Sequence, residues 1–174
     1  MYLNYILPLF LILLIVISVA YIRTFILQKK KKRILDTISD TAILLKDISG
    51  DIYIESSIYT RWIFFEKIEV VLDKSAIYLF PNKKILGNNL CGIVQIDVDK
   101  NNHYVNENAA LYLMLSDIKS ERKYIKLIGK ETEVSAKKYE VLMNFNNLPD
   151  KEIVLNYLSN SYILSESYSN YTEK

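Results

Sequence analysis

The residues best suited to metal chemistry lie in one short polar segment, DVDKNNHYVNEN. Asp97, Asp99 and Asn101 occupy positions 1, 3 and 5 of a calcium-binding loop, where oxygen ligands are needed. The segment then departs from that pattern, because position 6 is Asn102 instead of glycine and position 12 is Asn108 instead of glutamate. Since the bidentate ligand is missing, we interpret the segment as a hydrated turn after a strand. The sequence therefore predicts no metal site, and Asp97, Asp99 and Asn101 remain the only metal candidates.

The chain offers little for nucleophilic catalysis by a serine or cysteine paired with a histidine. His103 is the only histidine and Cys91 the only cysteine. A catalytic serine or cysteine needs a histidine beside it, and His103 lies in a polar loop, where a solvated role is typical. We interpret Cys91 as a small buried side chain at a strand edge. One cysteine also excludes an intramolecular disulfide and a zinc site built from several thiolates. The sequence therefore favours a protein that is not an enzyme and has no cofactor.

The strongest concentration of charge follows the first apolar segment. It consists of six cations: Arg23, Lys29, Lys30, Lys31, Lys32 and Arg33. Removing these six from the 22 cations leaves 16 against 20 acids, so the rest of the chain carries a formal charge of −4 although the whole carries +2. An acidic body binds polyanions poorly, which argues against a nucleic-acid partner. Beside a membrane, the six cations are expected to orient the preceding segment and to contact lipid headgroups.

The apolar segment before these cations predicts a transmembrane anchor at residues 1–27. Met1 to Ile22 has no charged side chain, and a helix of this length, at about 1.5 Å per residue, matches a hydrocarbon core about 30 Å thick. Ser18-Val19-Ala20 resembles a signal-peptide cleavage site, but the cations follow the apolar run instead of preceding it. We therefore expect a single-pass protein of the cell membrane, with the N-terminus outside and the C-terminal domain cytoplasmic.

Residues 28–50 are expected to form a basic juxtamembrane segment and a short amphipathic helix. The apolar residues of this segment follow one another mostly at spacings of three and four: Ile34, Leu35, Ile38, Ala42, Leu45 and Ile48. Ser49-Gly50-Asp51 would end the helix. The alternative is that residues 42–45 form a short strand.

From residue 51 the hydrophobic period changes to two, which predicts strands. In the longest of them, the face buried in the core is expected to carry Trp62, Phe64, Ile68, Val70 and Leu72. A turn at residues 73–75 and a returning strand at 76–80 complete a hairpin. Further strands are expected at 52–56, 92–98, 111–115, 123–128 and 139–145.

A helix is expected at residues 146–158, because Pro149 lies in its first turn and Asp150 lies near its positive N-terminus. Residues 161–174 are rich in serine and tyrosine and are expected to form a flexible tail.

This element order resembles the pleckstrin-homology-like (PH-like) superfold over residues 51–160. A strand followed by FNNLPDKEIVLNYL is similar to the end of such domains, and bacterial membrane proteins that carry a PH-like domain behind transmembrane helices are a second similarity. The resemblance implies an α+β, mainly β fold: an N-terminal transmembrane helix, then a seven-stranded barrel or sandwich closed by a C-terminal helix. Two features depart from the family pattern. PH domains usually carry a tryptophan in the closing helix, whereas Trp62 lies in an early strand. Members that bind phosphoinositides carry several Lys and Arg between their first two strands, whereas Arg61 is the only cation in the equivalent segment SSIYTRW.

We therefore expect a membrane-anchored, non-catalytic interaction module at the cytoplasmic face. Its expected partners are membrane lipid headgroups or a membrane-proximal protein. Two alternatives stay open: a membrane-tethered metal-dependent hydrolase that uses Asp97, Asp99 and His103, and an accessory subunit of a larger membrane complex.

Overall fold

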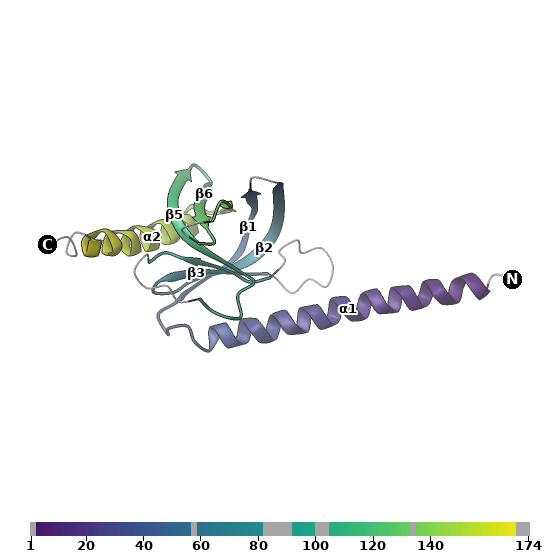
Figure 1. Cartoon of the computed structure of the whole chain (residues 1–174). Helices are drawn as coiled ribbons and strands as arrows, with labels where there is room; N and C mark the ends of the chain where they lie inside the picture. The colour runs from purple at the N-terminus through teal and green to yellow at the C-terminus, as the bar shows by residue number, and fades with distance from the viewer. Residues whose placement is uncertain (1–2, 57–58, 82–91, 100–104, 133–134, 170–174) are drawn as a thin grey trace.

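The computed structural model describes residues 3–56, 59–81, 92–99, 105–132 and 135–169. Its elements, in chain order, are α1 (Leu3–Leu35), β1 (Ile43–Glu55), β2 (Thr60–Leu72), β3 (Ala76–Phe80), β4 (Val94–Asp97), β5 (Leu111–Glu121), β6 (Tyr124–Lys130), β7 (Lys138–Asn144) and α2 (Leu148–Ser169). The barrel lies beside the C-terminal part of α1, and the N-terminal part of α1 extends well beyond it (Figure 1). The expected mainly-β architecture, with an N-terminal helix and a C-terminal helix, is confirmed.

The seven strands form a closed barrel in sequence order. Neighbouring strands are antiparallel, except for β4 and β5, which are parallel. Pairing of β1 with β7, from Ser49 opposite Asn144 to Glu55 opposite Lys138, closes the barrel. At Gly50 these two backbones approach closely, since a Cβ atom there would lie 1.8 Å from the carbonyl oxygen of Leu142.

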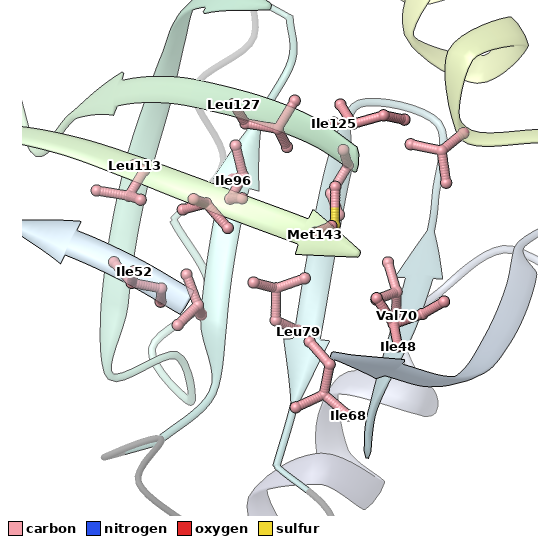
Figure 2. Packing of buried hydrophobic residues seen from close by; sticks show 14 of the residues in the cluster. Ile48, Ile52, Ile68, Val70, Leu79, Ile96, Leu113, Ile125, Leu127 and Met143 are labelled. Carbon is pink, nitrogen blue, oxygen red and sulfur yellow. The ribbon is translucent and has the colours of Figure 1, made fainter. Parts of the chain in front are cut away.

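The barrel interior is an apolar core to which all seven strands contribute (Figure 2). Its side chains come mostly from alternate strand positions, as expected for a sheet with one face inside. The fully buried members include Ile52, Ile68, Leu79, Ile96, Leu113, Ile125 and Met143.

The helix α2 closes this core from one side. Val154 and Leu158 are buried in the core cluster. The Lys151 ammonium group donates to the Glu121 carbonyl oxygen at 2.6 Å, which ties the helix to the β5–β6 turn. At the N-terminus, the Asn147 side chain accepts from the backbone N–H of Asp150 at 2.8 Å, a typical helix cap. The expected helix is therefore confirmed, and it continues to Ser169 through part of the predicted tail; residues 170–174 lie outside the described residues.

The amphipathic helix predicted within residues 28–50 is wrong. The helix α1 continues to Leu35, and β1 begins at Ile43, before the predicted start of the β domain at residue 51. Leu45 and Ile48 both point into the core although they are three residues apart. The cause is an irregularity in β1 at this point, where Asp47 has a φ of 60° and the register with β2 shifts. This bulge gave a strand the three-residue spacing of a helix.

The prediction of which β2 residues are buried is also partly wrong. Phe65, Ile68, Val70 and Leu72 are buried, whereas Trp62 and Phe64 are exposed. A second irregularity explains the change, because Lys67 has a φ of 51° and the β1–β2 register shifts again between Ile48 and Gly50. Beyond this bulge the side chains of β2 exchange faces, so the aromatic residues at the start of the strand lie outside the barrel.

Candidate membrane-boundary site

The C-terminal end of α1 packs against the outside of the barrel. Its contact with the barrel is a second apolar cluster, here called the clamp: Ile34, Val71, Ala76, Tyr78, Phe80 and Ile93. Ile34 is completely buried there. The strand β3 has the core on one face and the clamp on the other, which explains why all five of its residues are buried. The clamp therefore joins the apolar helix directly to the barrel wall.

Polar contacts reinforce the clamp. The Lys31 ammonium group lies 2.6 Å from a Glu69 carboxylate oxygen and 5.4 Å from the centroid of the Phe80 ring. Just after the helix, the Ser39 hydroxyl donates to the Asp73 carboxylate at 2.7 Å. The first contact joins the last turns of α1 to the β2–β3 hairpin, and the second joins the connection after α1 to the same hairpin. The helix end therefore has a defined position on the barrel.

The six cations predicted to contact lipid headgroups have three different environments. Lys31 points at the barrel and pairs with Glu69. Lys29, Lys32 and Arg33 are exposed on α1. Arg23, which is exposed, and Lys30, which is half-buried, line a cavity between α1 and the barrel. The cluster is thus divided between holding the barrel and facing its surroundings.

This cavity, here called the junction groove, has a volume of about 310 Å³. Its helix side consists of Val19, Ile22, Arg23, Ile26, Leu27 and Lys30, and its barrel side of Gly92, Ile93, Asn108 and Ala110. Gly92 is needed for the shape of the barrel side, because a Cβ atom there would lie 2.3 Å from the Ala110 Cβ. Among the described residues, the lining combines an apolar helix face with two cations and one amide, and it has no carboxylate.

A second exposed feature lies on the outer face of β1 and β2. It consists of Tyr53, Trp62 and Phe64, here called the aromatic surface. The ring centroids of Tyr53 and Trp62 are 4.5 Å apart, and those of Trp62 and Phe64 are 6.3 Å apart with nearly parallel planes. Trp62 and Phe64 are 55% and 57% exposed. Large exposed apolar side chains that lie together are typical of a surface that binds another protein, a membrane or a ligand.

The residues predicted as metal candidates do not form a ligand set in the part of the chain that the structure describes. Asp97 is buried, and its carboxylate accepts a hydrogen bond from the Tyr112 hydroxyl at 2.9 Å and from the backbone N–H of Asp99. Burial and this hydrogen bond raise the pKa of Tyr112. Asn101, together with Cys91 and His103, lies outside the described residues. Asp97 therefore has a structural role at the end of β4.

A cavity of about 460 Å³ lies between α2 and the β2–β3 turn. Tyr157 is on its wall, and its hydroxyl donates to the backbone carbonyl oxygens of Asp73 and Ala76. Burial raises the pKa of Tyr157, so the hydroxyl stays protonated and keeps these bonds. The Tyr157 hydroxyl thus ties α2 to the hairpin.

The chain matches no family model, and comparisons with curated proteins and with solved structures found no match. Sequence reasoning found the cations but missed the groove and the aromatic surface. A signal for the helix side of the groove was available, since its members recur at spacings of three and four. The barrel side lies far away in sequence and had no such signal.

Proposed function

We propose that this is a single-pass membrane protein whose barrel is a PH-like, non-catalytic interaction module that contacts the lipid headgroups of the cytoplasmic face. The observation that carries the proposal is the clamp between α1 and the barrel. The helix has 33 residues, or about 50 Å at 1.5 Å per residue, whereas a hydrocarbon core is about 30 Å thick. An 18-residue window within Leu7–Leu35 has a mean hydropathy of 2.6 and is not buried by the rest of the chain.

The excess length of α1 is the part that carries the cations and the clamp. A helix of this kind places its apolar part in the bilayer and its basic end in the headgroup layer. Because Ile34 and Lys31 hold the barrel against that basic end, the barrel is expected to lie at the membrane surface. The same charge distribution predicts that the surface is the cytoplasmic one.

The aromatic surface supports headgroups as the partner. Figure 1 shows β1 and β2 on the side of the barrel toward which the apolar part of α1 extends, whereas α2 leads away on the other side. Tyrosine and tryptophan favour the membrane–water interface because their rings are partly apolar and partly polar. Tyr53 and Trp62 are therefore suited to the headgroup layer in which the proposed orientation of α1 would put them.

Site-specific photocrosslinking in native membranes tests this proposal. A benzophenone amino acid in place of Phe64 is expected to give lipid adducts, which mass spectrometry of the full chain detects. The matched control carries the same amino acid in place of Ser159, which is exposed on α2, and is expected to give no lipid adduct. A protein adduct at position 64 would overturn the lipid assignment in favour of a membrane-proximal protein, and equal lipid adducts at both positions would show no preferred surface.

The topology is tested separately. An enzyme that is active only outside the cytoplasm is fused after Lys174, and the same enzyme is fused before Met1. The proposal predicts activity only for the N-terminal fusion. Activity of the C-terminal fusion would contradict it.

A further inference from the structure

We propose that the junction groove is a binding site for the phosphate headgroup of an anionic glycerophospholipid. This inference rests on the proposed function, because it requires α1 to cross the bilayer. It goes further by assigning one ligand chemistry to one cavity instead of general contact between the barrel and the membrane.

The geometry of α1 brings both cations to one wall. Arg23 and Lys30 are seven residues apart, so they lie on the same helix face about 10 Å apart along the axis. Arginine and lysine side chains are long and flexible, and two of them at this separation can reach a single phosphate group from both sides. Ile26 and Leu27 lie between them and provide the apolar floor.

The two cations of the groove have no acidic partner among the residues that the structure describes. In the part of the chain that the structure describes, Arg23 and Lys30 make no ion pair, in contrast to Lys31, whose ammonium group lies 2.6 Å from Glu69. The described residues of the groove lining include no aspartate or glutamate. Lys30 is half-buried beside apolar side chains, where the local dielectric constant is lower than in water, so its ammonium group attracts an anion more strongly there.

The apolar part of the lining favours a lipid over a free phosphate ion. Val19 and Ile22 continue the groove from Arg23 into the apolar part of α1, where a lipid acyl chain would run. A free phosphate ion would gain nothing from these side chains, whereas a lipid would bury its chain against them. The volume of about 310 Å³ is at the lower end of small-molecule pockets and suits a headgroup with the start of its chains.

Lipid binding to the full chain in mild detergent, followed by native mass spectrometry, tests the assignment. The probe is phosphatidylglycerol, and phosphatidylcholine is the zwitterionic comparison. The test variant is R23Q with K30Q, and the matched control is K29Q with K32Q, which removes the same charge from exposed positions of the same helix. We expect the test variant to bind phosphatidylglycerol about 30-fold more weakly, because it loses two cations at about 1 kcal/mol each beside the bound headgroup. The control is expected to change little, because Lys29 and Lys32 do not line the groove and would not contact a lipid bound in it.

Two further arms complete the design. Ala110→Phe fills the groove without changing its charge and is expected to weaken phosphatidylglycerol binding as well. Inorganic phosphate is expected not to displace the lipid, and displacement by millimolar phosphate would overturn the lipid as the ligand. Equal weakening in the test variant and in the control would overturn the groove as the site.

The outcomes also separate this inference from the proposed function. Lipid adducts at position 64 with unchanged phosphatidylglycerol binding in the test variant would overturn only the groove. Protein adducts at position 64 together with selective loss of phosphatidylglycerol in the test variant would overturn headgroup contact by the aromatic surface and leave the groove in place.

Discussion

Substitution of Ile34 by alanine is expected to release α1 from the barrel without unfolding the barrel. Ile34 is completely buried in the clamp, where it packs among residues of β2 and β3 and Ile93. It takes no part in the separate cluster that forms the barrel interior. The contact between helix and barrel should therefore weaken while the core stays intact.

The magnitude follows from the buried carbons. Alanine lacks three of the carbons of isoleucine, and each buried methylene is worth about 0.8 kcal/mol, which gives roughly 2.4 kcal/mol before any cavity forms. Measured isoleucine-to-alanine changes at buried sites cost about 2 to 5 kcal/mol once the cavity is included. Since about 1.4 kcal/mol is a factor of ten, the opening of the clamp should become at least about 30-fold more frequent.

Hydrogen exchange of the full chain in detergent micelles measures this opening. Amides that depend on the clamp include that of Asp36, which donates to the Lys32 carbonyl oxygen, and that of Ile38, which donates to the Ile34 carbonyl oxygen. We expect these amides to exchange faster in Ile34→Ala, while amides of β6 and β7 keep their protection. Leu35→Ala is the matched control, because Leu35 is the next residue of the helix but is 41% exposed. Equal exchange in the two variants, or equal loss of protection in β6 and β7, would refute the clamp as a separate unit.

Two further predictions concern the barrel itself, and urea unfolding of the full chain measures both. Gly50→Ala is expected to lower the free energy of unfolding by about 3 kcal/mol or more, because the Cβ atom of the alanine would force β1 and β7 apart at the Leu142 carbonyl oxygen. A loss below about 1 kcal/mol would contradict this prediction. Hydrogen bonds from Lys138 and Lys126 hold the pKa of Glu140 below its usual range. The contribution of the Glu140 carboxylate to the free energy of unfolding is therefore fully present above the unfolded-state pKa of about 4.3, and it is lost as the pH falls through the folded-state pKa. Glu140→Gln should lower the free energy of unfolding at pH 7 by less than about 1 kcal/mol, because both ion pairs of Glu140 are partly exposed. A difference in stability between the variant and the unmodified protein that persisted below the folded-state pKa of Glu140 would contradict this prediction.

The sequence predicted most of the barrel because local signals agree with the tertiary structure there. The turn at residues 73–75 lies between β3 and the end of β2, which pair in a regular register, and β3 was predicted with its exact bounds. The start of α2 was predictable from Pro149 and Asp150, which lie where helix N-termini favour them. These features depend on neighbours in the chain, so one sequence is enough to find them.

The errors lie where the backbone leaves its regular period. The irregularities at Asp47 and Lys67 each add one residue to a strand, and the side chains beyond them change faces. A pattern of apolar residues alone does not separate such a strand from a helix turn, which is why Leu45 and Ile48 predicted a helix and why Trp62 was expected inside the barrel. Neither aspartate nor lysine marks a bulge as glycine does, so the sequence carried little warning.

The candidate site was predictable only on its helix side. The basic residues of α1 predicted contact with lipid headgroups, but their division into Lys31 on the barrel, Arg23 and Lys30 in the groove, and the rest in solvent depends on where the barrel packs. That placement is set by Ile34 and by its partners on β2 and β3, which are about 40 residues further along the chain. Contacts over such separations have no local signature.

The fluorescence of Trp62 in lipid vesicles tests the central claim most directly, that the barrel holds its aromatic surface in the headgroup layer. Trp62 is the only tryptophan of the chain, so the unmodified protein reports its own position. With W62Y and Ser159→Trp, the only tryptophan moves to α2 and provides the matched control. We predict that lipids brominated near the headgroup end of their acyl chains quench Trp62 and not the α2 tryptophan. Quenching of Trp62 by aqueous iodide alone, with no effect of the brominated lipids, would contradict the claim.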